Sequence, residues 1–143
     1  MDLQNNLLFL SLKRYYTGNK LKQLLKYLKR DKISLRIVDW FVTNYSKKHD
    51  SIYNNNDKPF IVFHSYKSQL KSYSKKYFDP FCRRNRIDFY YNLNESISTT
   101  IGQLNFFRWA IDNLVIEYIL KYYDIIEDDM NTSIKNIRKN YIK

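Results

Sequence analysis

The segment from Lys67 to Arg86 concentrates side chains that bind phosphate groups. Seven of its twenty residues are basic: Lys67, Lys71, Lys75, Lys76, Arg83, Arg84 and Arg86. Lysine and arginine neutralise backbone phosphates, and arginine offers two parallel hydrogen bonds from one planar group. Aromatic rings at Tyr73, Tyr77 and Phe81 are interleaved with these charges and are of the kind on which bases stack. The segment therefore predicts contact with a nucleic-acid backbone.

A structural interpretation of the same segment is also open. The lysines would then be an ordinary solvated helix face, and the arginines would bridge to the carboxylates of Asp79 or Asp88. Arginine is clustered here although the chain otherwise favours lysine, which indicates a need for planar, bidentate donors. We therefore take the Lys67 to Arg86 segment as the primary candidate site.

A second basic group extends from Lys13 to Lys48, where eleven positive residues face two acids. Its candidate contact residues are Lys22, Lys26, Lys29, Arg30, Lys47 and Lys48. Ordinary solvation of amphipathic helices explains this pattern better than binding does, so the group is a secondary candidate. The two helices expected here resemble a helix-turn-helix in outline, but the turn lacks a glycine and no third helix is indicated.

The net charge of +11 favours polyanionic partners. The scarcity of Ala, Gly and Pro indicates AT-rich coding, which raises the lysine content along the whole chain. The charge is nevertheless uneven: residues 1–58 have 12 basic and 5 acidic groups, residues 59–98 have 7 and 3, and residues 99–143 have 6 and 6. The excess lies before residue 99, so coding alone does not explain it.

Residues suited to catalysis or metal binding are sparse. His64 and Cys82 lack the local signature of a base and a nucleophile, and core packing explains a strand histidine and a buried thiol better. Two histidines and one cysteine give no zinc spacing, and two glycines allow no phosphate loop. An acidic group lies in the C-terminal region but reads as a solvated helix end: Asp124, Glu127, Asp128 and Asp129. We expect a non-enzymatic protein without metal or cofactor.

A single cysteine excludes an internal disulfide and suits a reducing, intracellular compartment. The apolar run from Leu7 to Leu12 is interrupted by Ser11 and is much shorter than the roughly 20 residues of a membrane span. It also lacks a basic flank. We therefore expect no signal peptide, no transmembrane helix and no membrane partner.

Periodicity predicts the elements that carry the basic groups. Leucines at helical spacing predict a helix over 19–31, and Ser34 is placed to cap a second helix that ends at residues 46–48, giving a compact N-terminal helical hairpin. Residues 49–58 are predicted to be an exposed loop. A short buried strand over 60–64, a helix over 66–77 and a strand over 86–91 then form a small sheet with a strand-helix-strand unit.

The C-terminal third is predicted to contain one long buried helix over 101–126, opened by a capping box at Thr100 and Gln103. Its aromatic residues form core or, alternatively, a homodimer seam: Phe106, Phe107, Trp109, Tyr118, Tyr122 and Tyr123. The fold class is α+β, as a single compact domain over residues 1–130. A solvated tail rich in Lys and Asn follows over 131–143.

Three runs together carry a family resemblance: SLRIVDWFVTNYSKK at 34–48, the segment 66–86 and TTIGQLNFFRWA at 99–110. They resemble an uncharacterised protein family of nucleocytoplasmic large DNA viruses, the giant viruses, over about residues 34 to 130. The resemblance implies a viral protein that acts in the virus factory of the host cytoplasm or is packaged in the virion. It supplies no active site.

These observations predict a non-enzymatic nucleic-acid-binding protein that makes sequence-tolerant phosphate contacts, in genome packaging or transcription. DNA is favoured over RNA as the partner. The alternative is a protein-interaction or virion scaffold module that uses the aromatic C-terminal helix. A nuclease built on the C-terminal acidic group ranks third, because it would need a metal.

Overall fold

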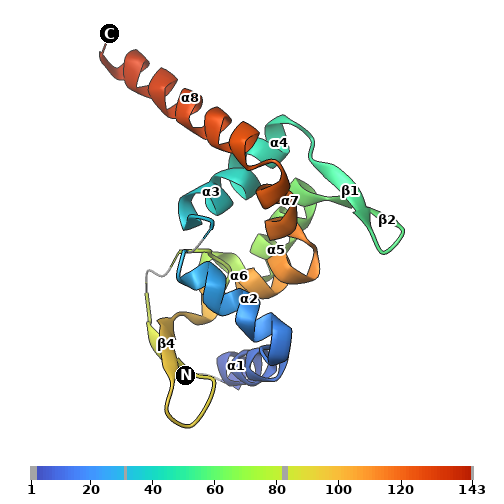
Figure 1. The fold of residues 1–143 in the computed structure, drawn as a ribbon, viewed down its shortest axis with the longest axis vertical. Helices are drawn as coiled ribbons and strands as arrows, with labels where there is room; N and C mark the ends of the chain where they lie inside the picture. Colours follow the sequence, from blue (N-terminus) through green and yellow to red (C-terminus); the bar gives the residue numbers. More distant parts are fainter. Residues whose placement is uncertain (1–2, 31, 82–83, 143) are drawn as a thin grey trace.

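The helix Ile101–Asp112 (α6) lies at the centre of the fold in a computed structural model that describes residues 3–30, 32–81 and 84–142 (Figure 1). The Thr100 side chain accepts a hydrogen bond from the backbone N–H of Gln103 at 3.0 Å, which confirms the predicted cap. Apolar residues occupy almost the whole circumference of α6, and residues 101–107 are all buried. The other elements are therefore arranged around this helix.

Within the described part of the chain, the helices that pack against α6 are α1 (Leu3–Tyr15), α2 (Gly18–Leu28), α5 (Val62–Tyr77) and α7 (Val115–Lys121). The predicted helices over 19–31 and 66–77 correspond to α2 and α5, whereas α1 was not predicted. Tyr27 of α2 stacks on Phe107 of α6, with ring centroids 5.9 Å apart. The N-terminal helices thus cover one side of the central helix.

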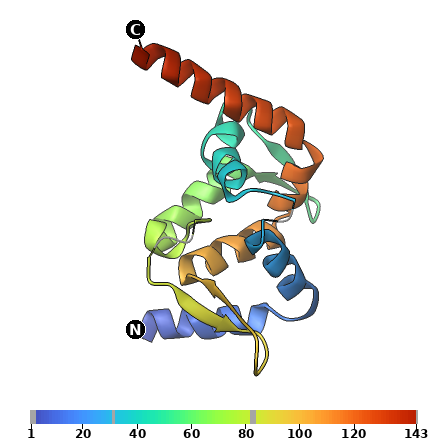
Figure 2. The same ribbon diagram turned by 60° about the vertical axis from the view of Figure 1, so that its left-hand side comes forward.

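A second helical stretch has three consecutive parts: α3 (Leu35–Trp40), the π-helical η1 (Phe41–Tyr45) and α4 (Ser46–Lys48). The Ser34 side chain accepts a hydrogen bond from the Ile37 N–H at 3.1 Å, as predicted. This stretch packs against α8 (Tyr123–Ile142), whereas α2 packs against α6. The two predicted helices exist, but they do not form a compact hairpin, and Figure 2 shows them in different halves of the molecule.

Residues 49–58, predicted to be a loop, contain the first strand of a β-hairpin. Strand β1 (Ile52–Asn55) pairs antiparallel with β2 (Lys58–Ile61). Asn56 and Asp57 connect them with φ angles of 52° and 63°, which fits a two-residue turn of type I′. Asn and Asp adopt this conformation more readily than most residues, so the loop prediction was wrong for a local reason.

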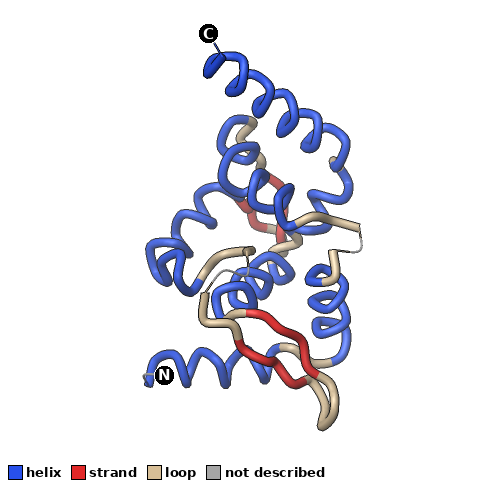
Figure 3. Tube along the Cα trace, turned by 90° about the vertical axis from the view of Figure 1, so that its left-hand side faces the viewer, coloured by secondary structure: helices blue, strands red, loops and turns tan. Residues whose placement is uncertain are grey.

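The strand predicted over 60–64 is displaced, because the β2 strand ends at residue 61 and Val62 already begins α5. The strand predicted over 86–91 is confirmed as β3 (Ile87–Tyr90), which pairs antiparallel with β4 (Ser96–Thr99). The strands that flank α5 therefore belong to two separate hairpins and not to one small sheet, as Figure 3 shows. The α+β class and the single compact domain are confirmed.

The predicted long helix over 101–126 is divided into α6, α7 and the start of α8. Asn113 ends α6, since its side-chain amide donates a hydrogen bond to the Trp109 carbonyl at 2.9 Å. Leu114 follows with a φ of 58°, a left-handed conformation that a helix cannot continue through. The apolar segment therefore turns back on itself and buries residues from all three helices.

The outer half of α8 projects from the rest of the protein (Figures 1 and 2). Residues 131–142, predicted as a solvated tail, are helical, and the side chains of residues 135–140 are exposed. No helix among the described residues combines the length and the apolar character needed to cross a membrane.

Candidate nucleic-acid interface

Helix α5 presents the predicted lysines on its solvated side. Lys67, Lys71 and the following pair at 75–76 are all exposed, while Val62 and Tyr66 on the opposite side are buried. Burial, reinforced by nearby carboxylates, raises the pKa of Tyr66 to about 12, so this ring stays uncharged in the core. The helix is therefore held by an apolar face and offers a basic one.

A kink interrupts the predicted row of lysines. Ser74 has φ 61° and ψ 169°, a conformation that residues other than glycine rarely adopt. Lys67 and Lys71 lie on the regular part of α5, and Lys75 and Lys76 follow the kink. Lys67 and Lys71 therefore share one helical face, which Lys75 does not continue.

The first turn of α6 holds the chain that follows α5. A Cβ at Gly102 would lie 2.9 Å from the Lys76 carbonyl oxygen, so only glycine allows this approach. Asn105 donates a hydrogen bond to the Tyr77 carbonyl and Gln103 donates one to the Pro80 carbonyl, both at 2.9 Å. These contacts fix the backbone that leads from the lysines to the arginines.

The three predicted aromatic contact residues have different surroundings. Tyr73 stacks on the buried Phe78 with an interplanar angle of 15°, so one of its faces is occupied. The Nζ atom of Lys76 lies 5.4 Å from the ring centroid of Tyr77. Phe81 is half-buried and lines a pocket. Of the three residues, Phe81 is the one that belongs to the described lining of this pocket.

Of the three clustered arginines, the two that the structure describes, Arg84 and Arg86, form no ion pair with the carboxylates named as an alternative. Arg86 donates a hydrogen bond from Nε to the Ser98 hydroxyl at 3.0 Å, and Arg84 is exposed. Neither Asp79 nor Asp88 forms an ion pair with a described basic side chain, and Asp79 accepts a hydrogen bond from the backbone N–H of Phe81. Arg83 and Cys82 lie outside the described residues.

The second basic group is distributed over two places. Lys22, Lys26 and Lys29 are exposed on α2, and Arg30 follows directly at the end of that helix. Lys48 differs from them, because its Nζ atom lies 2.6 Å from an Asp129 carboxylate oxygen. Its charge is therefore largely balanced, and we no longer count Lys48 among the free contact residues.

The fold brings the two basic groups together around Phe63. The Nζ atom of Lys47 lies 5.5 Å from the centroid of this ring and that of Lys67 lies 6.0 Å from it. Cation–π attraction thus stabilises two like charges from different groups at one aromatic ring.

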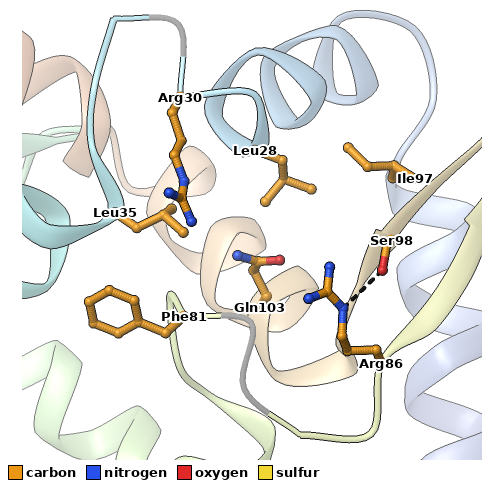
Figure 4. A pocket seen from close by; sticks show the side chains of 8 residues that line it. All are labelled: Leu28, Arg30, Leu35, Phe81, Arg86, Ile97, Ser98 and Gln103. Atoms are coloured by element: carbon orange, nitrogen blue, oxygen red, sulfur yellow. Dashed lines mark hydrogen bonds between the residues drawn. The ribbon is translucent and has the colours of Figure 1, made fainter.

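A second meeting point is a pocket of about 250 Å³ lined by both Arg30 and Arg86 (Figure 4). Its remaining polar lining comes from Ser98 and Gln103. Its apolar lining is Leu28, Leu35, Phe81 and Ile97. Two arginines that lie far apart in the sequence therefore line the same pocket. Nothing in the sequence indicated this proximity.

The C-terminal acidic group has a structural use at one position. The Asp129 carboxylate accepts hydrogen bonds from Trp40 at 2.9 Å and Lys48 at 2.6 Å, and His49 lies 3.5 Å away. Burial alone would raise the pKa of Asp129, but these hydrogen bonds together lower it below its ordinary value. Among the described residues, no group of three or more His, Cys, Asp or Glu side chains is arranged to hold a metal ion.

Two further predictions need correction. His64 was expected in the core of a strand, but it lies exposed on α5. The aromatic residues of α6, predicted as core or as a homodimer interface, belong to the core. Phe106 and Phe107 are fully buried and Trp109 is 6% exposed. Tyr118, Tyr122 and Tyr123 are half-buried. The core reading of these rings is the correct one for α6.

Residues 2–142 match a family of unknown function, DUF7197. The chain belongs to this family. It is also similar to "Uncharacterized protein L507" of Acanthamoeba polyphaga mimivirus, with 46% identity over 112 residues. That alignment covers 72% of this chain and 43% of the relative, so the chain spans less than half the length of that protein. The resemblance to an uncharacterised giant-virus family is confirmed, and no solved structure matches the chain.

In this DUF7197 member, the uncharged residues that shape the basic surface were not predicted as part of the site. Phe63 was assigned to a strand, and Ser98 drew no attention. Gln103 was recognised as part of a cap, but its side chain accepts a hydrogen bond from Thr99 and donates to Pro80. Asn105, a polar residue inside an apolar helical run, was the available signal that α6 binds a neighbouring backbone.

Proposed function

We propose that this DUF7197 protein is a non-enzymatic nucleic-acid-binding protein that makes sequence-tolerant contacts with the phosphate backbone. The observation that carries the proposal is the convergence of two basic groups, through Lys47 and Lys67 at Phe63 and through Arg30 and Arg86 at the pocket. Basic side chains that gather on one protein raise the local concentration of a polyanion and add phosphate contacts. DNA is the favoured partner, in the virus factory or the virion, with a role in genome packaging or transcription.

Charge balance supports the same function. Within residues 3–30, 32–81 and 84–142, Lys48 is the one basic side chain of the two groups that forms an ion pair with a carboxylate. Structural lysines and arginines commonly have acidic neighbours, because a paired charge stabilises both groups. Unpaired exposed cations cost little in water and are available to phosphates, whose condensed counterions they release.

A mobility-shift titration with wild type and a Lys71→Glu, Arg84→Glu double variant tests the proposal. The variant should bind DNA at least tenfold more weakly at low salt, since two contacts become repulsive. Lys121→Glu, an exposed change on α7, is the matched control and should retain affinity within about threefold. Wild-type affinity should also fall steeply with salt, with a log–log slope of about −0.9 per phosphate contact on duplex DNA. Equal binding by both proteins, or none by wild type at low salt, would refute the proposal.

The second candidate is a protein-interaction or scaffold role. Because the α6 rings are internal, this role would fall to the projecting α8, where Ile125 and Ile137 are 58% and 52% exposed. Light scattering that finds an obligate oligomer, together with no affinity for DNA or RNA, would favour this candidate over nucleic-acid binding.

A further inference from the structure

The arginine pocket combines two cations with an apolar wall. The guanidinium groups of Arg30 and Arg86 point from opposite sides toward the Gln103 amide (Figure 4). None of the described residues that line the pocket is acidic, so among these residues the two charges face the hollow without a carboxylate partner. A phosphate group suits a hollow lined by two guanidinium groups, because arginine binds phosphate oxygens bidentately.

Hydrogen bonds within the protein hold two polar side chains of the pocket, Arg86 and Gln103, in place. Arg86 uses Nε for its hydrogen bond to Ser98, and its two terminal nitrogen atoms make no described hydrogen bond. Gln103 is fixed between the Thr99 hydroxyl, 2.6 Å away, and the Pro80 carbonyl, 2.9 Å away. A site whose donors are already oriented binds its ligand with less loss of conformational freedom.

Arg30 occupies a strained position. It follows the end of α2 with a φ of 58°, the left-handed conformation for which glycine is preferred after a helix. Its backbone N–H donates a hydrogen bond to the Tyr27 carbonyl at 3.1 Å, as expected for a helix-terminating residue. A strained residue with a large cationic side chain that lines a pocket is typical of a position retained for binding.

The apolar half of the pocket and its size restrict the ligand. Phe81 supplies an aromatic ring, and Leu28 and Leu35 add aliphatic lining. The volume of about 250 Å³ is below the range of about 300–1,000 Å³ that is usual for drug-sized ligands, so the occupant is small. An anion with one flat, apolar body fits this combination of lining residues.

We infer that the pocket holds one unpaired nucleotide of a single strand, with its phosphate between Arg30 and Arg86 and its base beside Phe81. A base in a duplex is stacked and paired and cannot enter such a pocket, whereas an unpaired base is free to stack on an aromatic side chain. The inference rests on the proposed function and adds a preference for single-stranded over duplex nucleic acid.

Fluorescence anisotropy with a labelled single strand and the duplex of the same sequence tests this preference. Wild type should bind the single strand at least tenfold more tightly than the duplex. Arg30→Gln and Phe81→Leu should bring this ratio close to one, because each weakens the single-strand complex much more than the duplex complex. Lys71→Gln is the matched control and should weaken both complexes by the same factor. An equal affinity of wild type for both forms, or a ratio that the pocket variants leave unchanged, would overturn the inference.

A second measurement separates the pocket from the proposed function. In NMR titrations, thymidine monophosphate should shift the Arg86 Nε–H signal, whereas thymidine and inorganic phosphate should shift it much less. If the monophosphate shifts this signal and no polymer binds, the proposed function fails and the nucleotide pocket stands. Equal shifts by inorganic phosphate, or monophosphate affinity as high as that of the strand, would overturn the assignment to a nucleotide of a strand.

Discussion

Asp129 links the C-terminal helix to the stretch that ends in α4. Its carboxylate is 12% exposed and accepts hydrogen bonds from Trp40 and Lys48, which lie some eighty positions earlier in the sequence. A buried carboxylate with two donors contributes to stability mainly in its ionised form. Asp129, one residue of the acidic group that a nuclease would need as its metal site, thus connects α8 to the α3–α4 stretch through hydrogen bonds.

Asp129→Asn should lower the free energy of unfolding by about 1–2 kcal/mol at pH 7, because charge-assisted hydrogen bonds are lost. The pKa of Asp129 is lower in the folded than in the unfolded protein, so its contribution is present above the ordinary pKa of about 4. The difference between wild type and variant should shrink as the pH falls below about 4. Urea denaturation of both proteins at several pH values measures this difference in the free energy of unfolding.

Asp128→Asn provides the control, since Asp128 is the exposed neighbour of Asp129 on the same helix. It should change stability by less than about 0.5 kcal/mol at every pH. A pH-independent loss in Asp129→Asn would contradict the role of the ionised carboxylate and would point to altered packing alone.

Arg30 should show opposite effects on stability and binding. Arg30→Gly removes the left-handed strain after α2 and should raise the free energy of unfolding by about 0.5–1 kcal/mol. It also removes a cation from the pocket and should weaken single-strand binding about tenfold. Arg30→Gln retains the strain and loses the charge, so it should weaken binding without the gain in stability. Thermal denaturation and anisotropy of the two variants measure these effects.

At the scale of elements, the sequence predicted the segments whose pattern depends on one periodicity. Leucines at helical spacing gave α2, the cap at Ser34 gave the start of α3, and alternation gave β3. Helix α1 was not predicted because its apolar residues do not form one continuous buried stripe: Leu7 and Leu10 are exposed, while Leu12 is buried. Local patterns therefore identify an element only where one face is uniformly buried.

The misassigned elements depend on conformations that apolar periodicity does not encode. The first hairpin turns at Asn56 and Asp57, which both have positive φ angles. In the sequence these two residues belong to an Asn-rich stretch that is typical of a loop. The predicted long helix ends at Asn113 and Leu114 because the Asn113 carbonyl accepts a hydrogen bond from the Tyr53 hydroxyl and its side chain binds Asn55. These contacts are tertiary and join α6 to a hairpin some sixty residues earlier.

The contact between α5 and α6 leads to a prediction at this scale. Gly102→Ala places a methyl group 2.9 Å from the Lys76 carbonyl oxygen, within a backbone that other hydrogen bonds hold in place. We expect a loss of about 1–3 kcal/mol in the free energy of unfolding, because the helix or the chain after α5 must move. Denaturant titration measures it, and Ser68→Ala on the exposed side of α5 should be nearly neutral. A neutral Gly102→Ala would mean that the two backbones separate easily.

At the scale of the whole molecule, the sequence predicted which residue types make up the candidate site but not the shape of that site. The Lys67 to Arg86 segment was recognisable from charge and aromatic content alone. The pocket was not, because Arg30 and Arg86 meet only when α2 and the second hairpin both pack beside α6. The approach of the two arginines depends on several tertiary contacts at once, and a single sequence does not reveal those contacts.

The domain boundary near residue 130 leads to the final prediction. Ile126 and Met130 are buried and Asp129 is paired, whereas the residues that follow on α8 lie mostly in solvent. A chain that ends at Met130 should therefore keep its free energy of unfolding within about 0.5–1 kcal/mol of wild type. The removed residues 131–143 carry four basic and no acidic groups. None of them belongs to the candidate interface, so only the long-range positive field weakens and DNA affinity should fall by less than about fivefold.

A chain that ends at Ile125 is the contrasting variant, because it loses the buried Ile126 and Met130 together with Asp129. It should be destabilised by about 3 kcal/mol or more, as expected when large core side chains and a buried carboxylate are removed. Circular dichroism melts and anisotropy of both truncations measure the difference. A tenfold loss of DNA affinity on truncation at Met130, with the fold intact, would instead place phosphate contacts on the outer turns of α8 and extend the interface beyond α2 and α5.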